Sequence, residues 1–328
     1  MKKKVLGLLV TLMFFAFILY KIDVDSVLRA INSFTPNSLA LITGFYILAL
    51  LLRGVRWKLF LGNDKKYSWF ELSEIFTVGT MLNIFLPARA GDVYRAYYLG
   101  DIKHEKKMKI FGSVILERLF DGTALFIILL FATMRYFAHS KIINITVGTA
   151  GTIFLGSTLI AFLLIKTGKI NTLLNFLEEK FNQDNNLFRK LRIYITNFTE
   201  GFSVLNNPLS SGLAFGYSFV IWVLECVVAY LIINSFGVTF PISAGLFVLS
   251  LITFSTMIPS TSIFLGPFQA AYILALGIYG VDKEFALAVS VVHNVILTLI
   301  VTAIGLTCLL KSQLISKKYT PNRWYPYI

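Results

Sequence analysis

The sequence predicts an all-α polytopic membrane protein with six full spans and two proline-broken re-entrant hairpins, eight apolar segments in total. Hydrophobic residues make up 56% of the 328 residues and charged residues only 14%, which leaves too little polar surface for a water-soluble protein of this length. The apolar runs approach the roughly 20 residues that a spanning helix needs. They lack the alternation of polar and apolar residues that marks a membrane β-barrel.

Six apolar runs are predicted to cross the membrane as complete helices. The first follows the basic start MKKK, as in a signal peptide, but no small-residue cleavage site comes after it. We therefore interpret it as a retained span. The six predicted spans are Val5–Tyr20, Ser38–Leu52, Ile110–Met134, Ile142–Ile165, Leu213–Phe236 and Phe285–Leu310.

Two further apolar stretches, Leu72–Leu86 and Ile242–Ile258, are each followed by a proline, Pro87 or Pro259, and then by polar and small residues. Proline removes a backbone donor and interrupts a helix. We therefore predict that both stretches turn back and leave the membrane on the side where they entered. The alternative is that both stretches cross completely, which gives eight crossings. The placement of charge does not distinguish this topology from the re-entrant one.

The formal net charge of +13 is distributed as expected beside a membrane, and nucleic acid is not an expected partner. With both hairpins re-entrant, Arg118 lies in a span and five of the 30 Lys and Arg residues lie outside. The rest are then cytoplasmic or lie in segments connected to the cytoplasmic side. This bias predicts that both termini lie on the cytoplasmic side. The five external residues are Lys21, Arg29, Arg135, Lys141 and Lys283.

A shift of 172 residues relates the two halves of the chain. It carries Pro87 onto Pro259, and it lays the span Ile110–Met134 over the last span. Each half then holds an odd number of crossings, so the halves are inverted relative to each other. We predict a single transmembrane domain, 1–328, made of the halves 1–141 and 142–328. A chance coincidence of two prolines is the alternative, because the halves are weakly similar in sequence.

The segment 166–207 is polar and basic, with apolar residues at helical spacing. We interpret it as a cytoplasmic amphipathic insertion in which Arg189, Lys190 and Arg192 meet anionic headgroups. A solvated linker is the alternative.

Charged residues gather in the run Asn83–Leu99, NIFLPARAGDVYRAYYL, around a helix break. Arg89 is expected near the interior of the bilayer, where an arginine is costly without a partner. Asp92 and Arg95 share a helical face, and a helix that starts near Gly91 directs its positive end toward the break. This arrangement favours anion binding, with Asn83, Pro87 and Gly91 as cavity or hinge residues.

A second cluster lies inside the predicted span Ile110–Met134. Glu117 and Asp121 are four residues apart and face one way, with Arg118 beside them. We predict that these carboxylates pair with Arg89 and Arg95 in one connected charge network. A structural lock without a ligand is the alternative.

The second half contributes polar residues without a comparable charge cluster. Its break reads MIPSTSIFLGPFQAAY, and further polar residues lie in the fifth and last spans. These side chains are candidates to complete the cavity, although a purely structural role for Glu225 or His293 is equally compatible with the pattern. The second-half candidates are Glu225, Pro259, Ser260, Gly266, Gln269, His293 and Asn294.

Several signatures are missing from the sequence. It has no Walker A loop, no zinc-ligand spacing, no nucleophile elbow and no dinucleotide fingerprint. No metal, cofactor or catalytic residue is therefore expected, and transport would be downhill or ion-coupled.

The motifs LPARAGDVYR and LERLFD, followed by a second broken hairpin, resemble the transmembrane domain of lysylphosphatidylglycerol synthases. Free-standing relatives are described as flippase-like. The family commonly has a glutamate at the position of Asp92, and a glycine-rich turn with a later glutamate where this chain has Ser260–Ser262 and Gln269. The soluble aminoacyl-transferase domain of the full synthases is not expected here, which favours a non-enzymatic role.

The resemblance implies a lipid translocase in a bacterial or archaeal cytoplasmic (inner) membrane. It would move a phospholipid or lipid-linked headgroup across that membrane through a charged midplane cavity. Arg89, Arg95 and Arg118 would hold the phosphate of an anionic or zwitterionic headgroup. Asp92, Glu117 and Asp121 would neutralise these arginines in the empty state or engage a cationic group of the headgroup. The alternative is a membrane component of a lipid-modifying transferase, including one that serves a separately encoded lipid-modifying enzyme.

Overall fold

The computed structural model describes residues 24–86, 89–134, 141–167, 186–237, 239–255 and 266–319, and these form helices and connecting turns without any strand. The predicted class, a helical polytopic membrane protein, is confirmed. The predicted first span, Val5–Tyr20, lies outside the described residues, as do Pro87, Pro259 and Ser260. The helices are α2 (Val24–Asn32), η1 (Pro36–Ser38), α3 (Leu39–Phe60), α4 (Trp69–Phe85), α5 (Ala90–Lys103), α6 (Lys107–Met134), α7 (Lys141–Lys166), α9 (Asn186–Glu200), η3 (Ser203–Asn206), α10 (Pro208–Asn234), α11 (Ile242–Ser255), α12 (Pro267–Gly277) and α13 (Lys283–Tyr319).

Three stretches of the described chain are long and apolar enough to cross a membrane by length and composition: 36–60, 208–234 and 283–311. The helix α3 continues to Phe60, beyond the predicted end at Leu52, because the arginines that follow Leu52 are buried inside the bundle. The helix α10 starts at Pro208, before the predicted Leu213. Asn207 caps this start, because its side chain accepts a hydrogen bond from the backbone N–H of Ser210 at 3.2 Å.

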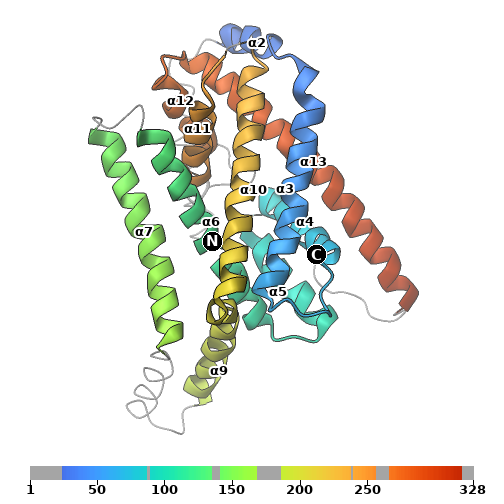
Figure 1. Ribbon diagram of the computed structural model, residues 1–328. Helices are drawn as coiled ribbons and strands as arrows, with labels where there is room; N and C mark the ends of the chain where they lie inside the picture. The colour runs from blue at the N-terminus through green and yellow to red at the C-terminus, as the bar shows by residue number, and fades with distance from the viewer. Residues whose placement is uncertain are drawn as a thin grey trace.

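Helices α3 and α10 run antiparallel through the centre of the molecule (Figure 1). The start of α3 lies beside the end of α10, where the backbone N–H of Thr35 donates to the carbonyl oxygen of Ser235 at 2.7 Å. The helix pair α4 and α5 follows the C-terminal end of α3, and the pair α11 and α12 follows the C-terminal end of α10. Because α3 and α10 are antiparallel, these two ends lie at opposite ends of the bundle. The two pairs therefore come from opposite ends of the bundle.

The pair α4 and α5 starts and finishes at one end of the molecule, where Lys103 of α5 forms an ion pair with Glu71 of α4 at 2.6 Å. The two helices touch along their backbones, because a Cβ atom at Gly91 would overlap the carbonyl oxygen of Gly79. Only glycine permits this approach.

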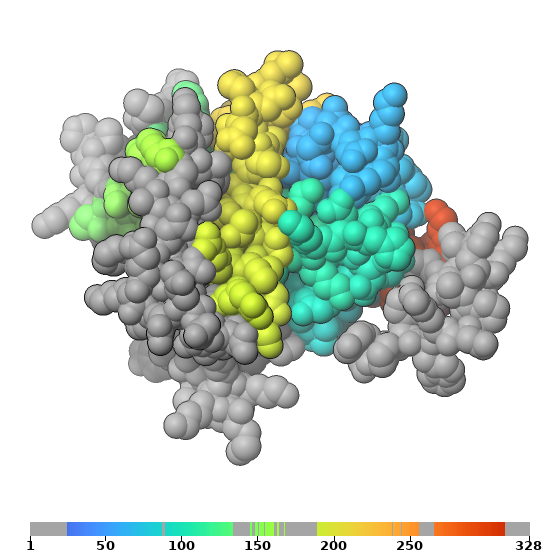
Figure 2. Space-filling model, turned by 90° about the horizontal axis from the view of Figure 1, so that it is seen from below, coloured from blue at the N-terminus to red at the C-terminus, as the bar shows by residue number. Residues whose placement is uncertain are grey.

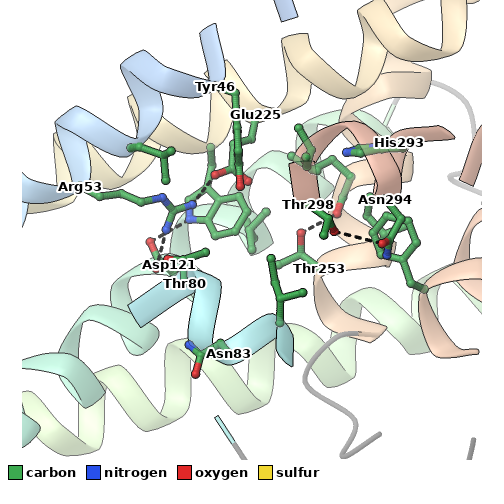
Figure 3. A pocket seen from close by; sticks show the side chains of 18 of the residues that line it. Tyr46, Arg53, Thr80, Asn83, Asp121, Glu225, Thr253, His293, Asn294 and Thr298 are labelled. Carbon is green, nitrogen blue, oxygen red and sulfur yellow. Dashed lines mark hydrogen bonds and ion pairs between the residues drawn. The ribbon is translucent and has the colours of Figure 1, made fainter. Parts of the chain in front are cut away.

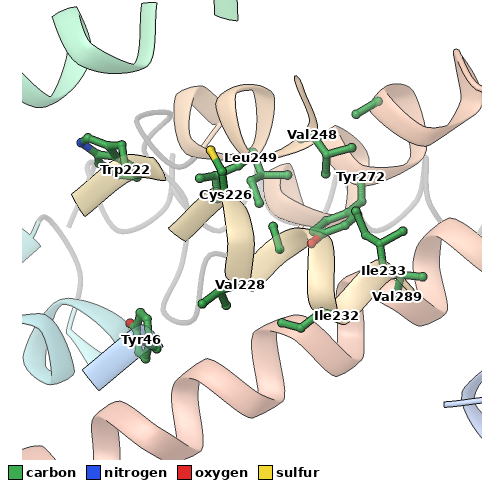
Figure 4. Packing of buried hydrophobic residues seen from close by; sticks show 14 of the residues in the cluster. Tyr46, Trp222, Cys226, Val228, Ile232, Ile233, Val248, Leu249, Tyr272 and Val289 are labelled. Carbon is green, nitrogen blue, oxygen red and sulfur yellow. The ribbon is translucent and has the colours of Figure 1, made fainter. Parts of the chain in front are cut away.

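The pair α11 and α12 also starts and finishes at one end of the molecule. Phe240, just before α11, makes an edge-to-face contact with Tyr279, just after α12, with ring centroids 6.2 Å apart. Buried apolar side chains of α10 to α13 pack with others from α3, α4 and α6 in the larger hydrophobic core, which includes Val248, Tyr272 and Val289 (Figure 4). This core holds the second helix pair against the central helices.

The amphipathic helices α2 and α9 lie at opposite ends of the bundle (Figure 1). Figure 2 shows the α9 end, where the yellow-green residues of α9 lie close to the teal start of α6. Lys106 and Glu200 form an ion pair at 2.8 Å, and Phe111 contacts Phe198 with ring centroids 6.3 Å apart. Residues 186–200 of the predicted insertion 166–207 are thus helical, while 168–185 lie outside the described residues.

Candidate functional site

A cavity of about 220 Å³ lies where the central helices meet both helix pairs (Figure 3). Its wall combines charged side chains, mainly from the first half of the chain, with apolar and neutral polar side chains. The lining residues are Tyr46, Leu50, Arg53, Phe76, Thr80, Asn83, Ile84, Arg89, Arg118, Asp121, Leu125, Trp222, Glu225, Leu249, Ile252, Thr253, Phe268, His293, Asn294, Leu297 and Thr298.

Arg53 of α3 joins the two central helices at the cavity. Its guanidinium donates to Glu225 of α10 at 2.5 Å and lies 3.9 Å from Asp121 of α6. The Trp222 ring lies against the same guanidinium, with its centroid 5.0 Å from Cζ, a distance at which a cation and an aromatic face attract. Arg53 is only 6% exposed, so these contacts replace nearly all of its hydration.

Arg56 lies one turn further along α3 and is fully buried. It binds the carboxylate of Asp121, lies 3.1 Å from Glu117, and donates to the hydroxyl of Ser218 at 2.8 Å. Trp222 also donates its indole N–H to Asp121 at 2.8 Å. The two carboxylates that face one way on α6 are therefore held by one arginine of α3.

Arg95 of α5 lies behind the cavity wall and does not line it. It forms an ion pair with Glu117 at 2.8 Å. Its guanidinium is placed between the rings of Trp57 and Phe76, with centroids 4.2 and 4.4 Å from Cζ. Its exposure of 1% excludes direct contact with a bound headgroup in this conformation.

Arg89 immediately precedes α5 and lines the cavity, in a left-handed backbone conformation with φ of 53°. Asp92 of α5 lies close by and accepts hydrogen bonds from Arg118 at 2.9 Å and from the amide of Asn83 at 3.1 Å. The first turn of α5 thus gathers two arginines and an amide at one side of the cavity.

The ion pairs form one continuous alternating series of basic and acidic groups. It begins with Arg118, Asp92 and Arg95 and continues to Glu117 of α6. Arg56 then links Glu117 to Asp121, and Arg53 links Asp121 to Glu225. These side chains therefore form one connected charge network. Together with Arg89, the described residues of the site include five guanidinium groups (Arg53, Arg56, Arg89, Arg95 and Arg118) and four carboxylates (Asp92, Glu117, Asp121 and Glu225). The site thus has an excess of one positive charge.

The pairing within the network differs in part from the sequence-based expectation. Glu117 pairs with Arg95 as predicted, but Asp121 is bound by Arg56 and Trp222. Sequence reasoning missed Arg53 and Arg56 because basic residues that follow an apolar run are typical of the cytoplasmic flank of a span. Their spacing of three residues, which places both on one helical face, was the available signal.

The second half places three of its predicted residues, Glu225, His293 and Asn294, on the cavity wall. His293 is hydrogen-bonded through Nδ1 to the hydroxyl of Tyr272, and Asn294 accepts a hydrogen bond from Thr298 at 3.3 Å.

Gln269 and Gly266 lie away from the cavity wall. The Gln269 side chain accepts a hydrogen bond from the backbone N–H of Gly266 at 2.8 Å and so caps the start of α12. Among the described residues, no cluster of three or more His, Cys, Asp or Glu side chains is arranged to hold a metal ion.

Comparison with known proteins places this architecture in a family. The family model of the lysylphosphatidylglycerol synthase TM region matches residues 4–305. The UPF0104 membrane protein MJ1078 of Methanocaldococcus jannaschii is 29% identical over 220 residues, which cover 66% of this chain and 87% of that protein. Glycosyltransferase AglD of Haloferax volcanii is 31% identical over 119 residues, which cover 36% of this chain and 19% of that protein. No solved structure gave a significant match.

Proposed function

The chain belongs to the lysylphosphatidylglycerol synthase transmembrane-region family, and from this premise we propose that it is a lipid translocase. It would move a phospholipid or lipid-linked headgroup across the membrane through the charged cavity. The observation that carries the proposal is the excess of one positive charge around a cavity inside a helical membrane bundle. Ionisable groups in such surroundings are costly, and they are retained mainly where they serve a substrate or ion pathway.

We assign phosphate binding to Arg89 and Arg118, which line the cavity beside the start of α5. The first N–H groups of a helix and its positive end favour an anion there. Arg53 takes the place of Arg95 as the third phosphate ligand, because Arg53 lines the cavity and Arg95 is enclosed between Glu117 and two aromatic rings. Glu225 and Asp121 neutralise Arg53 in the empty state.

We also propose that the halves 1–141 and 142–328 are inverted relative to each other and that both helix pairs are re-entrant. Reciprocal packing supports this proposal, since α4 contacts α13 while α11 contacts α6. Arg53 and Glu225, which pair with each other, are separated by 172 residues, the same shift that relates the two predicted breaks. Such a repeat would place the cavity near the bilayer midplane, where transporters of this construction bind their substrates.

Replacement of Arg89 by alanine tests the translocase proposal. Purified protein in vesicles is expected to move an acyl-labelled phospholipid between leaflets, and Arg89→Ala is expected to abolish this movement because it removes the excess charge at the cavity. The rate is measured from the fraction of label that a membrane-impermeant quencher reaches. Arg29→Ala is the matched control, since Arg29 lies on the surface of α2. Equal rates for Arg89→Ala and the unchanged protein would contradict the assignment.

The similarity to glycosyltransferase AglD favours one second candidate, a membrane component of a lipid-modifying transferase. In that role the cavity would present a lipid phosphate to a separately encoded enzyme. Mass spectrometry of lipids from cells with and without the gene distinguishes the two roles. A lipid species that depends on the gene, together with no lipid movement in vesicles, supports the transferase component.

A further inference from the structure

We infer that the cavity selects a phosphodiester with one negative charge whose headgroup is an uncharged polyol, such as glycerol, inositol or a single sugar. The inference rests on the proposed translocase function and narrows its substrate class. Two independent features support it: the charge balance of the network and the neutral polar wall opposite Arg53.

The charge balance favours one negative charge. Five arginines and four carboxylates leave an excess of one positive charge, which a phosphodiester cancels. A zwitterionic headgroup leaves the excess in place, a cationic aminoacyl headgroup adds to it, and a phosphomonoester dianion reverses it. Net charge is costly in a site of low dielectric constant, so the balanced complex is the most stable of the four.

The far wall of the cavity supplies neutral hydrogen-bonding groups. Thr253, Asn294 and Thr298 lie across the cavity from Arg53 and Asp121, with His293 beside them (Figure 3). The lining residues from α11, α12 and α13 include no carboxylate, lysine or arginine. Hydroxyl and amide side chains both donate and accept hydrogen bonds, which matches the hydroxyl groups of a polyol. The two carboxylates that line the cavity, Asp121 and Glu225, are already engaged by Arg53.

The size of the cavity limits what it encloses. Its volume of about 220 Å³ is below the roughly 300 to 1,000 Å³ of most small-molecule pockets. A phosphate with a compact polyol is suited to this space, whereas acyl or polyprenyl chains would extend from it into the surrounding lipid. The inference therefore concerns the headgroup, and both glycerolipids and polyprenyl lipids could carry it.

The test compares headgroups in vesicles of phosphatidylcholine that contain the full-length protein. The labelled probes are phosphatidylglycerol, phosphatidylinositol, a polyprenyl phosphohexose, phosphatidylethanolamine, phosphatidic acid and lysylphosphatidylglycerol. At least one of the three polyol lipids (phosphatidylglycerol, phosphatidylinositol and the polyprenyl phosphohexose) is expected to move about tenfold faster than phosphatidylethanolamine, phosphatidic acid or lysylphosphatidylglycerol. One well-formed hydrogen bond supplies a ratio of this size. The glycerolipid and polyprenyl probes distinguish the two lipid sources.

Thr298→Val tests the neutral wall directly. It removes one hydroxyl at nearly constant volume, so the ratio of the phosphatidylglycerol rate to the phosphatidic acid rate is expected to fall severalfold. Thr307→Val is the matched control, because Thr307 lies on the same helix, outside the cavity, and its hydroxyl donates to its own helix backbone at 2.8 Å. Thermal unfolding of each variant reports whether it is folded.

The outcomes separate this inference from the proposed function. Movement of all six lipids at equal rates, or an unchanged ratio in folded Thr298→Val, would overturn the polyol inference and leave the translocase proposal standing. If no lipid moved faster than in protein-free vesicles, the proposed function and the inference would both be wrong.

Discussion

Arg56 shows how a charged side chain is kept inside this bundle. It is fully buried, yet it lies between Glu117 and Asp121 and also donates to Ser218. Two carboxylates on one face of α6 would repel each other without a cation between them. The arginine therefore stabilises the charged motif of α6, and it lies outside the cavity that binds substrate in our proposal.

Arg56→Gln is expected to destabilise the folded protein by about 3 to 5 kcal/mol, because it leaves two buried carboxylates without their shared partner. Unfolding of the purified protein in detergent measures this free energy. Lys65→Gln is the control, since Lys65 is exposed in the turn after α3, and a change within about 0.5 kcal/mol is expected there. Equal stability of Arg56→Gln and Lys65→Gln would show that the pairing around Arg56 contributes little.

Among the elements, the pair α4 and α5 determines where the cavity arginines lie. The contact between Gly79 and Gly91 holds α5 directly against α4, and the first turn of α5 then presents Arg89 to the cavity. Asn83 near the end of α4 reinforces this arrangement through its hydrogen bond to Asp92. The position of Arg89 thus depends on a backbone contact as well as on its own side chain.

Gly91→Ala is expected to separate the start of α5 from α4, because its methyl group has no space beside the carbonyl of Gly79. Overpacking of this kind costs about 1 to 3 kcal/mol. The expected result is a lower unfolding temperature together with slower lipid movement. Gly44→Ala on α3 is the matched control, since a methyl group there meets no neighbouring atom, and it should be neutral or stabilising. Unchanged lipid movement in Gly91→Ala would contradict the importance of the contact.

At the scale of the whole molecule, basic residues are unevenly divided between the two ends of the bundle. Among the described residues, the α9 end carries most of the basic side chains outside the bundle interior, including Lys65, Lys66 and Lys106, whereas Arg29 lies on α2 at the other end (Figure 1). Short loops rich in lysine and arginine stay in the cytoplasm. We therefore expect the α9 end, from which α4 and α5 enter the bundle, to face the cytoplasm.

Labelling of single cysteines tests this orientation. In a Cys308→Ser background, Arg29→Cys is expected to react with a membrane-impermeant maleimide in intact cells, and Lys65→Cys only after the membrane is opened. Both positions are exposed, so access to the reagent decides the result, and the remaining native cysteine, Cys226, is buried. The reverse pattern would invert the proposed topology.

The sequence by itself determined the fold class and most of the helices, and it singled out several residues that line the cavity. Apolar length predicted α6, α7 and α10 to within about five residues at each end, and the start of α13, because the hydrocarbon layer sets the length of a spanning segment. The helix α13 continues to Tyr319, beyond the predicted end at Leu310. The motif residues Arg89, Arg118 and Asp121 were predicted because charges inside apolar runs are costly and are seldom retained without a purpose.

Only the tertiary structure decided how the charges pair and which of them face the cavity. Arg53 pairs with Glu225 across 172 residues, and Arg56 with Asp121 across 65. Arg95, predicted to hold phosphate, lies enclosed behind the wall, while Arg53 takes a place on it. The physical reason is that local spacing determines which side chains share a helical face, whereas partners for buried charges come from the packing of helices far apart in the chain.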